Sequence, residues 1–173
     1  MTTRPKLRKF ALTAHIVSSV GWLGAVACTL ALSVAGMTSQ DADVVRAIYL
    51  ALELTGWSVL IPFSLASLFT GLVQSLGTKW GLFRHYWVLV KLAINLFATV
   101  ILLMYMQTLG ALADLAAQPR AAGGDLSDLS SPSPVLHAGA AVLLLLVAAA
   151  LSVYKPRGLT RYGWRKQRTA SAA

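Results

Sequence analysis

The chain has 173 residues, of which 57% are hydrophobic and only 12% are charged. The charged residues lie between and outside long apolar runs, a distribution typical of membrane proteins. The net charge of +9 does not indicate nucleic-acid binding, because the basic residues flank the apolar runs and do not line a surface with interleaved aromatic residues. A single cysteine, Cys28, excludes an intrachain disulfide and argues against a cysteine-based metal site.

Four apolar runs are long enough to cross a bilayer: roughly residues 10–35, 48–76, 86–109 and 135–154. About 20 helical residues cover the ~30 Å hydrocarbon core. We therefore predict an all-α fold, a polytopic membrane protein with a four-transmembrane-helix bundle, and one domain over residues 1–173. The basic residues before the first run are also typical of a secretory signal, but this apolar run exceeds the about 7–15 residues of a signal, which predicts a retained span.

The basic residues predict the orientation of the four spans. Twelve of them fall on one side: Arg4, Lys6, Arg8, Lys9, Lys79, Arg84, Lys155, Arg157, Arg161, Arg165, Lys166 and Arg168. Only Arg46 and Arg120 fall on the other side. Because basic loops stay in the cytoplasm, we expect a protein of the bacterial cytoplasmic membrane with both termini cytoplasmic.

Two segments outside the spans have distinct compositions. Residues 116–134 are rich in Ala, Gly, Ser and Pro and predict a mobile extracytoplasmic linker. The segment after the fourth span interleaves Tyr154, Tyr162 and Trp164 with basic residues. This composition is typical of an anchor against anionic lipid headgroups.

Helical periodicity places polar and small residues on one face of each of the first three spans. In the first span this stripe comprises His15, Ser18, Ser19, Trp22, Thr29 and Ser33. In the second span it comprises Glu53, Gly56, Trp57, Ser64, Ser67, Gly71 and Gln74. In the third span it comprises Arg84, Trp87, Lys91, Asn95 and Thr99. Such stripes predict close packing and hydrogen bonds between helices, with Lys91 facing the bundle.

Lys91 and His15 are predicted to lie at one depth, about 8 Å inside the cytoplasmic ends of their helices at 1.5 Å per residue. Ionisable residues within a membrane are candidates for function, and two at one level could form a shared site. The alternative is that Lys91 extends to the headgroups and His15 makes one interhelical hydrogen bond.

The other two histidines lie at opposite ends. His85 lies at the cytoplasmic edge of the third span. There it could contact lipid headgroups or act as a metal or cofactor ligand. Glu53 and His137 are expected at about the same depth, at the outer end of the bundle. This shared depth predicts an ion pair between them. No two histidines have chelating spacing within one helix, so a metal bound by His15 would need ligands from several helices.

The stretches "HIVSSVGWLGAV", "HYWVLVKL" and "YKPRGLTRYGWRKQ" resemble a group of small bacterial integral membrane proteins of unknown function. More distantly, the first-helix histidine and the later lysine are similar to those of the copper-resistance D family and the haem-containing membrane protoporphyrinogen oxidases. In the oxidases the histidine is taken as a haem ligand and the lysine as important for activity, roles that the resemblance implies for His15 and Lys91. The stretch after Trp22 lacks the basic and aromatic residues of the oxidases.

Two functions remain open from the sequence. The first is a cytoplasmic-leaflet pocket that binds haem b, a metal or a small redox ligand, with His15 as metal ligand, His85 at its mouth, and Lys91 or Arg84 meeting a propionate. The second is a non-catalytic membrane subunit or partner-binding bundle whose polar residues serve helix packing. The expected partners are the lipid bilayer and, as a further candidate, a second copy or another membrane protein.

Overall fold

The structure, a computed structural model, describes residues 5–77, 81–118, 129, 131–156 and 158–171. Regular elements in this part of the chain are all helical: α1 (Pro5–Thr38), α2 (Ala42–Thr55), the π-helix η1 (Gly56–Leu60), α3 (Ile61–Gly77), α4 (Tyr86–Ala117), α6 (Ser133–Tyr154) and α7 (Arg161–Ser171). Four stretches are long and apolar enough to span a membrane: Pro5–Thr38, Ala42–Gly77, Tyr86–Ala117 and Ser133–Tyr154. The predicted all-α, four-span membrane fold is confirmed.

Some sequence expectations fall on undescribed positions. Most of the linker predicted over residues 116–134 lies outside the described residues. The same holds for four of the basic residues used for orientation, Arg4, Lys79, Arg120 and Arg157.

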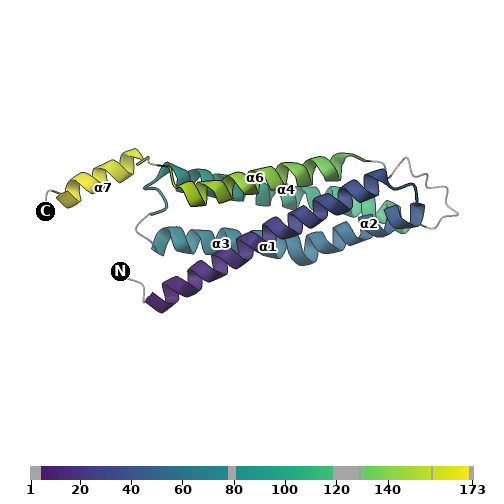
Figure 1. Ribbon diagram of the computed structural model, residues 1–173, viewed down its shortest axis with the longest axis horizontal. Helices are drawn as coiled ribbons and strands as arrows, with labels where there is room; N and C mark the ends of the chain where they lie inside the picture. Colours follow the sequence, from purple (N-terminus) through teal and green to yellow (C-terminus); the bar gives the residue numbers. More distant parts are fainter. Residues whose placement is uncertain (1–4, 78–80, 119–128, 130, 157, 172–173) are drawn as a thin grey trace.

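The four spans run alternately in opposite directions, so both ends of the chain lie at one end of the bundle (Figure 1). The first span, α1, packs against the second span, α2–η1–α3, and against the fourth, α6. The third span, α4, packs against the same two neighbours. The first and third spans therefore face each other across the bundle, as do the second and fourth.

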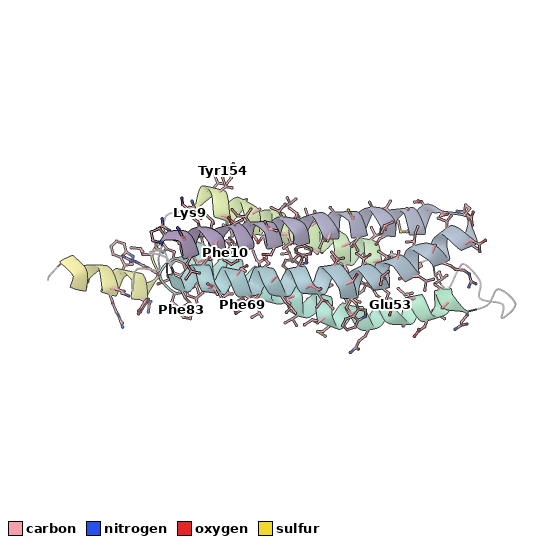
Figure 2. All side chains as sticks on the ribbon, turned by 90° about the horizontal axis from the view of Figure 1, so that it is seen from below. Lys9, Phe10, Glu53, Phe69, Phe83 and Tyr154 are labelled. Atoms are coloured by element: carbon pink, nitrogen blue, oxygen red, sulfur yellow. The ribbon has the colours of Figure 1, made fainter. Side chains whose placement is uncertain are left out.

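Large apolar side chains cover the outside of the bundle (Figure 2). Phe10, Phe69, Phe83 and Tyr154 are all exposed and project away from the neighbouring helices. An unpaired apolar surface around all spans is what a lipid environment requires, because hydrocarbon solvates such side chains. The outer surface thus agrees with a membrane-embedded bundle.

The π-helix η1 changes which side chains of the second span face inward. Trp57 was predicted in the inward stripe, but it is 56% exposed, so this prediction is wrong. A π-turn accommodates an extra residue, which shifts the phase of the helix relative to a regular 3.6-residue repeat. Gly56 and Leu60 are buried on either side of Trp57, and the inward stripe resumes at Ser64 and Ser67.

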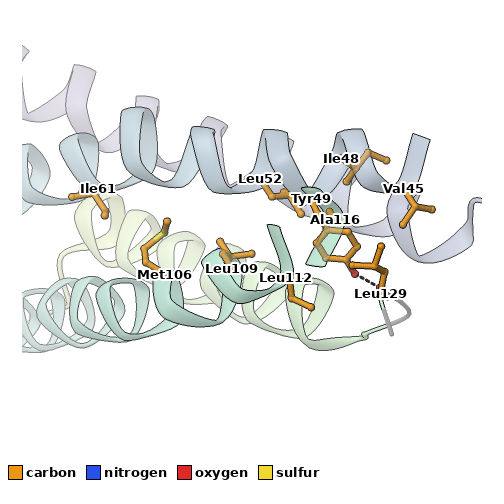
Figure 3. Packing of buried hydrophobic residues seen from close by; sticks show 10 residues of the cluster. All are labelled: Val45, Ile48, Tyr49, Leu52, Ile61, Met106, Leu109, Leu112, Ala116 and Leu129. Atoms are coloured by element: carbon orange, nitrogen blue, oxygen red, sulfur yellow. Dashed lines mark hydrogen bonds between the residues drawn. The ribbon is translucent and has the colours of Figure 1, made fainter. Parts of the chain in front are cut away.

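The end of the bundle away from the termini has an apolar core. Ten buried residues form one cluster there (Figure 3): Val45, Ile48, Tyr49, Leu52, Ile61, Met106, Leu109, Leu112, Ala116 and Leu129. The Tyr49 hydroxyl donates a hydrogen bond to the Leu129 carbonyl oxygen. This bond ties the chain that follows α4 to α2.

Arg46 caps the end of α4. Its guanidinium donates to the carbonyl oxygens of Ala116, at 3.0 Å, and Gln118. The last carbonyls of a helix have no partner within the helix, and a cation there also interacts favourably with the helix dipole. Arg46 therefore has a structural role at the end of the bundle where basic residues are few.

Replacing Arg46 by Met should lower the free energy of unfolding by about 1.5–3 kcal/mol, because it removes charge-assisted hydrogen bonds to α4. Reversible unfolding in mixed micelles measures this change. Arg46→Lys keeps the charge but not the two-pronged geometry, so its loss should be smaller. Equal stability of Arg46→Met and the unmodified chain would contradict the capping role.

Candidate functional site

His15 lies on α1 and is half-buried against α3. Its Nδ1 is 3.0 Å from the Thr70 hydroxyl oxygen. Thr70 donates its own proton to the Ala66 carbonyl oxygen at 2.6 Å, so its oxygen is left to accept. The network therefore assigns the proton of a neutral His15 to Nδ1 and leaves the Nε2 lone pair available.

A glycine makes room for the His15 ring. A Cβ on Gly71 would lie 3.1 Å from Cε1 of His15, tighter than an ordinary contact. Helix α3 thus presents both an acceptor, Thr70, and a small residue to the imidazole. Together they fix the ring's position and orientation, which is a property of histidines that bind metals.

One turn further into the membrane, three helices meet through hydrogen bonds. The Ser67 hydroxyl of α3 lies 3.0 Å from the Ser19 hydroxyl of α1. It also accepts a hydrogen bond from Asn95 Nδ2 of α4 at 3.2 Å. Ser67 is therefore the junction between the first, second and third spans.

Lys91 is directed towards the fourth span. Its ammonium donates to the Ser152 hydroxyl of α6. Ser152 in turn donates to the Ala148 carbonyl oxygen at 2.9 Å, which leaves its oxygen as an acceptor. Lys91 is half-buried, so the ammonium is bound between α4 and α6, less than one turn from the end of α6.

His15 and Lys91 do not bond to each other. His15 bonds to the second span and Lys91 to the fourth, on different sides of the bundle. Ser19 and Asn95 both contact Ser67, and His15 and Lys91 lie one helical turn before them, so the two groups share a level but face different neighbours.

Three levels of polar side chains follow from these contacts. Helix spacing of three or four residues places one residue of each of three spans at every level. We call this set the polar ladder: His15, Thr70 and Lys91; then Ser19, Ser67 and Asn95; then Trp22, Ser64 and Thr99. Ser64, Ser67, Trp22 and Thr99 are almost completely buried.

The polar ladder ends near the middle of the bundle. One turn beyond its third level lie Val26 and Leu60, which belong to a buried apolar cluster that also includes Trp22. The larger apolar core of Figure 3 continues from there to the far end. The polar ladder therefore begins at the end of the bundle that holds the termini and stops near the middle of the bundle.

Arg84 and His85 are held by the segment after the fourth span. His85 pairs with Leu159 in an isolated antiparallel bridge. The Arg84 carbonyl oxygen accepts from Thr160 N at 3.1 Å, and Tyr86 N donates to Gly158 O at 3.3 Å. We call these contacts between residues 83–86 and 158–163 the C-terminal clip; it places α7 beside the predicted mouth of the site.

Thr160 also starts α7. Its hydroxyl accepts from Gly163 N at 3.1 Å and donates to the Phe83 carbonyl oxygen. A Cβ at Gly163 would lie 2.5 Å from the Arg84 carbonyl oxygen, a backbone atom that has no rotamer to change. Only glycine fits at this position while the clip is closed.

Gly163→Ala should therefore open the C-terminal clip and loosen the start of α7, a helix that contains several sites for trypsin. Cleavage after Arg161 should become faster in membranes or nanodiscs than in the unmodified chain. Gly158→Ala is the matched control, because its Cβ would meet Tyr86 at an ordinary 3.6 Å. Equal cleavage rates for the two variants would contradict the close packing at Gly163.

Glu53 does not pair with His137, so that prediction is wrong. His137 Nδ1 lies 2.9 Å from the Ser133 carbonyl oxygen of its own helix, and its ring stacks on Tyr105 with centroids 3.9 Å apart. Glu53 approaches α4, with Oε1 3.5 Å from a Cβ built on Gly110. The second and fourth spans lie diagonally in the bundle, which separates the two residues.

Sequence reasoning missed Thr70, Ser152 and Thr160. Thr70 follows Ser64 and Ser67 at three-residue spacing, a signal that could have identified it. Within the described part of the chain, no three His, Cys, Asp or Glu side chains group as a metal site. A metal at His15 would therefore take its other ligands from elsewhere, as the iron of a haem does from the porphyrin.

Comparisons with protein-family models, with curated proteins and with solved structures give no match. The class of the protein therefore follows from its fold and composition alone. It is a four-span, all-helical membrane protein with a polar ladder in one half of the bundle.

Proposed function

We propose that this protein of the bacterial cytoplasmic membrane binds a redox ligand, most simply haem b, at the first level of the polar ladder. One observation supports this most directly. His15 donates Nδ1–H to Thr70, whose own proton is committed to Ala66, so Nε2 is free to coordinate a metal. A histidine oriented through its second nitrogen is the usual arrangement in metal sites.

Charge near His15 fits an anionic ligand. Lys91 lies at the same level of the polar ladder as His15, and Arg84 lies at the end of the bundle where the polar ladder begins. Their positive charges would meet carboxylates such as haem propionates. The resemblance of His15 and Lys91 to residues of the haem-containing membrane oxidases agrees with these roles.

The chain's own residues would have limited tasks in such a site. His15 would bind the iron, Thr70 and Gly71 would orient the imidazole, and Lys91 would hold an acidic group. When bound, haem would supply one-electron chemistry. The apolar cluster beyond Trp22 would keep water from reaching the site from the far side.

The non-catalytic alternative also has an observation in its favour. Ser19, Ser67 and Asn95 bond to one another, and Lys91 bonds to Ser152, so much of the ladder already connects helices. Interhelical hydrogen bonds of this kind stabilise membrane bundles by about 0.6 kcal/mol on average. In that case the polar ladder serves packing, and the protein acts as a membrane subunit.

Protein purified in mild detergent from haem-replete cells should show a Soret band that is lost in His15→Ala. Thr70→Val removes the acceptor for Nδ1–H and should weaken haem affinity by about 10–100-fold, the usual effect of losing such a partner. Lys91→Met should also reduce affinity, while insertion stays intact because an apolar side chain replaces a charge.

His137→Ala is the control for this experiment, because His137 is exposed at the opposite end of the bundle. It should leave the Soret band unchanged. Colourless, metal-free protein would reject the haem proposal in favour of the packing role.

Both termini should be cytoplasmic, since the bundle brings them to one end and most basic residues lie there (Figure 1). Reporter fusions at Ala173 and within residues 123–131 should report opposite sides of the membrane. A periplasmic signal from the Ala173 fusion would reverse the orientation.

A further inference from the structure

Three buried polar atoms at the inner end of the polar ladder have no hydrogen-bond partner among the described residues: Trp22 Nε1, Asn95 Oδ1 and Thr99 Oγ1. Trp22 and Thr99 are each only 2% exposed. The other polar atom of Asn95, Nδ2, bonds to Ser67, so this side chain is already fixed. These atoms belong to adjacent levels of α1 and α4.

Leaving such groups unpaired is costly. A buried donor or acceptor without a partner costs about 1–3 kcal/mol, and a membrane offers no alternative partner. The indole Nε1–H can only donate and the amide Oδ1 can only accept, whereas the threonine hydroxyl can do both. A species that accepts from Trp22 and donates to Asn95 would satisfy both.

We propose that the third level of the polar ladder is a binding site for water. A water molecule accepts from Trp22 Nε1–H, donates to Asn95 Oδ1 and bonds to the Thr99 hydroxyl. Buried waters typically make about three hydrogen bonds to polar groups that are otherwise unsatisfied. This water site does not require a ligand at His15, so it can be tested independently of haem binding.

The surroundings favour a small neutral occupant. The walls of this level are apolar, with Val26, Leu60 and Ala98 in the same cluster as Trp22. No charged residue belongs to the second or third level of the ladder, so an ion would lose its hydration without compensation. Ser19 and Ser67, whose hydroxyl oxygens are 3.0 Å apart, lie between this level and the pair formed by His15 and Thr70.

Water at the third level of the polar ladder lies at mid-membrane depth, two helical turns from His15. The far half of the bundle is instead held by its apolar core.

Hydroxyl-radical footprinting by synchrotron radiolysis tests the proposal, because bound water is activated in place and oxidises the side chain next to it. Met106 is the internal control: like Trp22 it is 2% exposed and it lies in the apolar core. In the full chain in nanodiscs, Trp22 should be oxidised several-fold faster than Met106. Equal protection of both residues would overturn the proposal.

Thr99→Val removes one water partner at nearly constant shape. It should reduce the oxidation of Trp22 and lower the melting temperature by about 2–4 °C, the shift expected for roughly 1 kcal/mol in a chain of this size. If the polar atoms are instead unpartnered, Thr99→Val removes a penalty, so a raised melting temperature with unchanged Trp22 oxidation would refute the site.

Thr29→Val is the matched variant. Thr29 is also buried, but its hydroxyl donates to the Ala25 carbonyl oxygen of its own helix at 2.9 Å. This substitution should leave Trp22 oxidation unchanged. A decrease equal to that of Thr99→Val would assign the effect to general loosening of the bundle and reject a local water.

Discussion

The absence of hydrogen-bond partners in hydrocarbon is the constraint on which this structure depends. A polar side chain within a span is therefore stabilised only by a partner on its own helix, on a neighbouring helix or on a bound water. Here the hydroxyls of Thr70 and Ser152 give their protons to backbone carbonyls of their own helices. Their oxygens are then acceptors only, and each receives an ionisable side chain from another span.

This constraint divides the bundle into two unlike halves. The half near the termini is joined by hydrogen bonds through Ser19, Ser67 and Asn95, which specify which faces meet. The other half is joined by apolar contacts around Leu52, Met106 and Leu109 (Figure 3). The two halves therefore differ in the kind of contact that holds the spans together.

The number of spans, their approximate limits and the inward polar stripes could be predicted from the sequence, because length and periodicity determine them. The exceptions have physical causes. Trp57 faces outward because a π-turn shifts the helical phase, which no regular repeat reveals. The shared depth of His15 and Lys91 was predictable, but their partners depend on which spans are neighbours. Glu53 and His137 were mispaired for the same reason, since depth alone does not place helices around a bundle.

The C-terminal clip has a consequence for biosynthesis. Residues 83–86 leave the ribosome before the third span is complete, whereas residues 158–163 are made only after the fourth span. The carbonyl oxygens of Phe83 and Arg84 therefore gain their hydrogen-bond donor, Thr160, only after the fourth span has been synthesised. Closure of the clip requires that the fourth span has returned to the side where the second ended, so it occurs only in chains whose spans are all inserted.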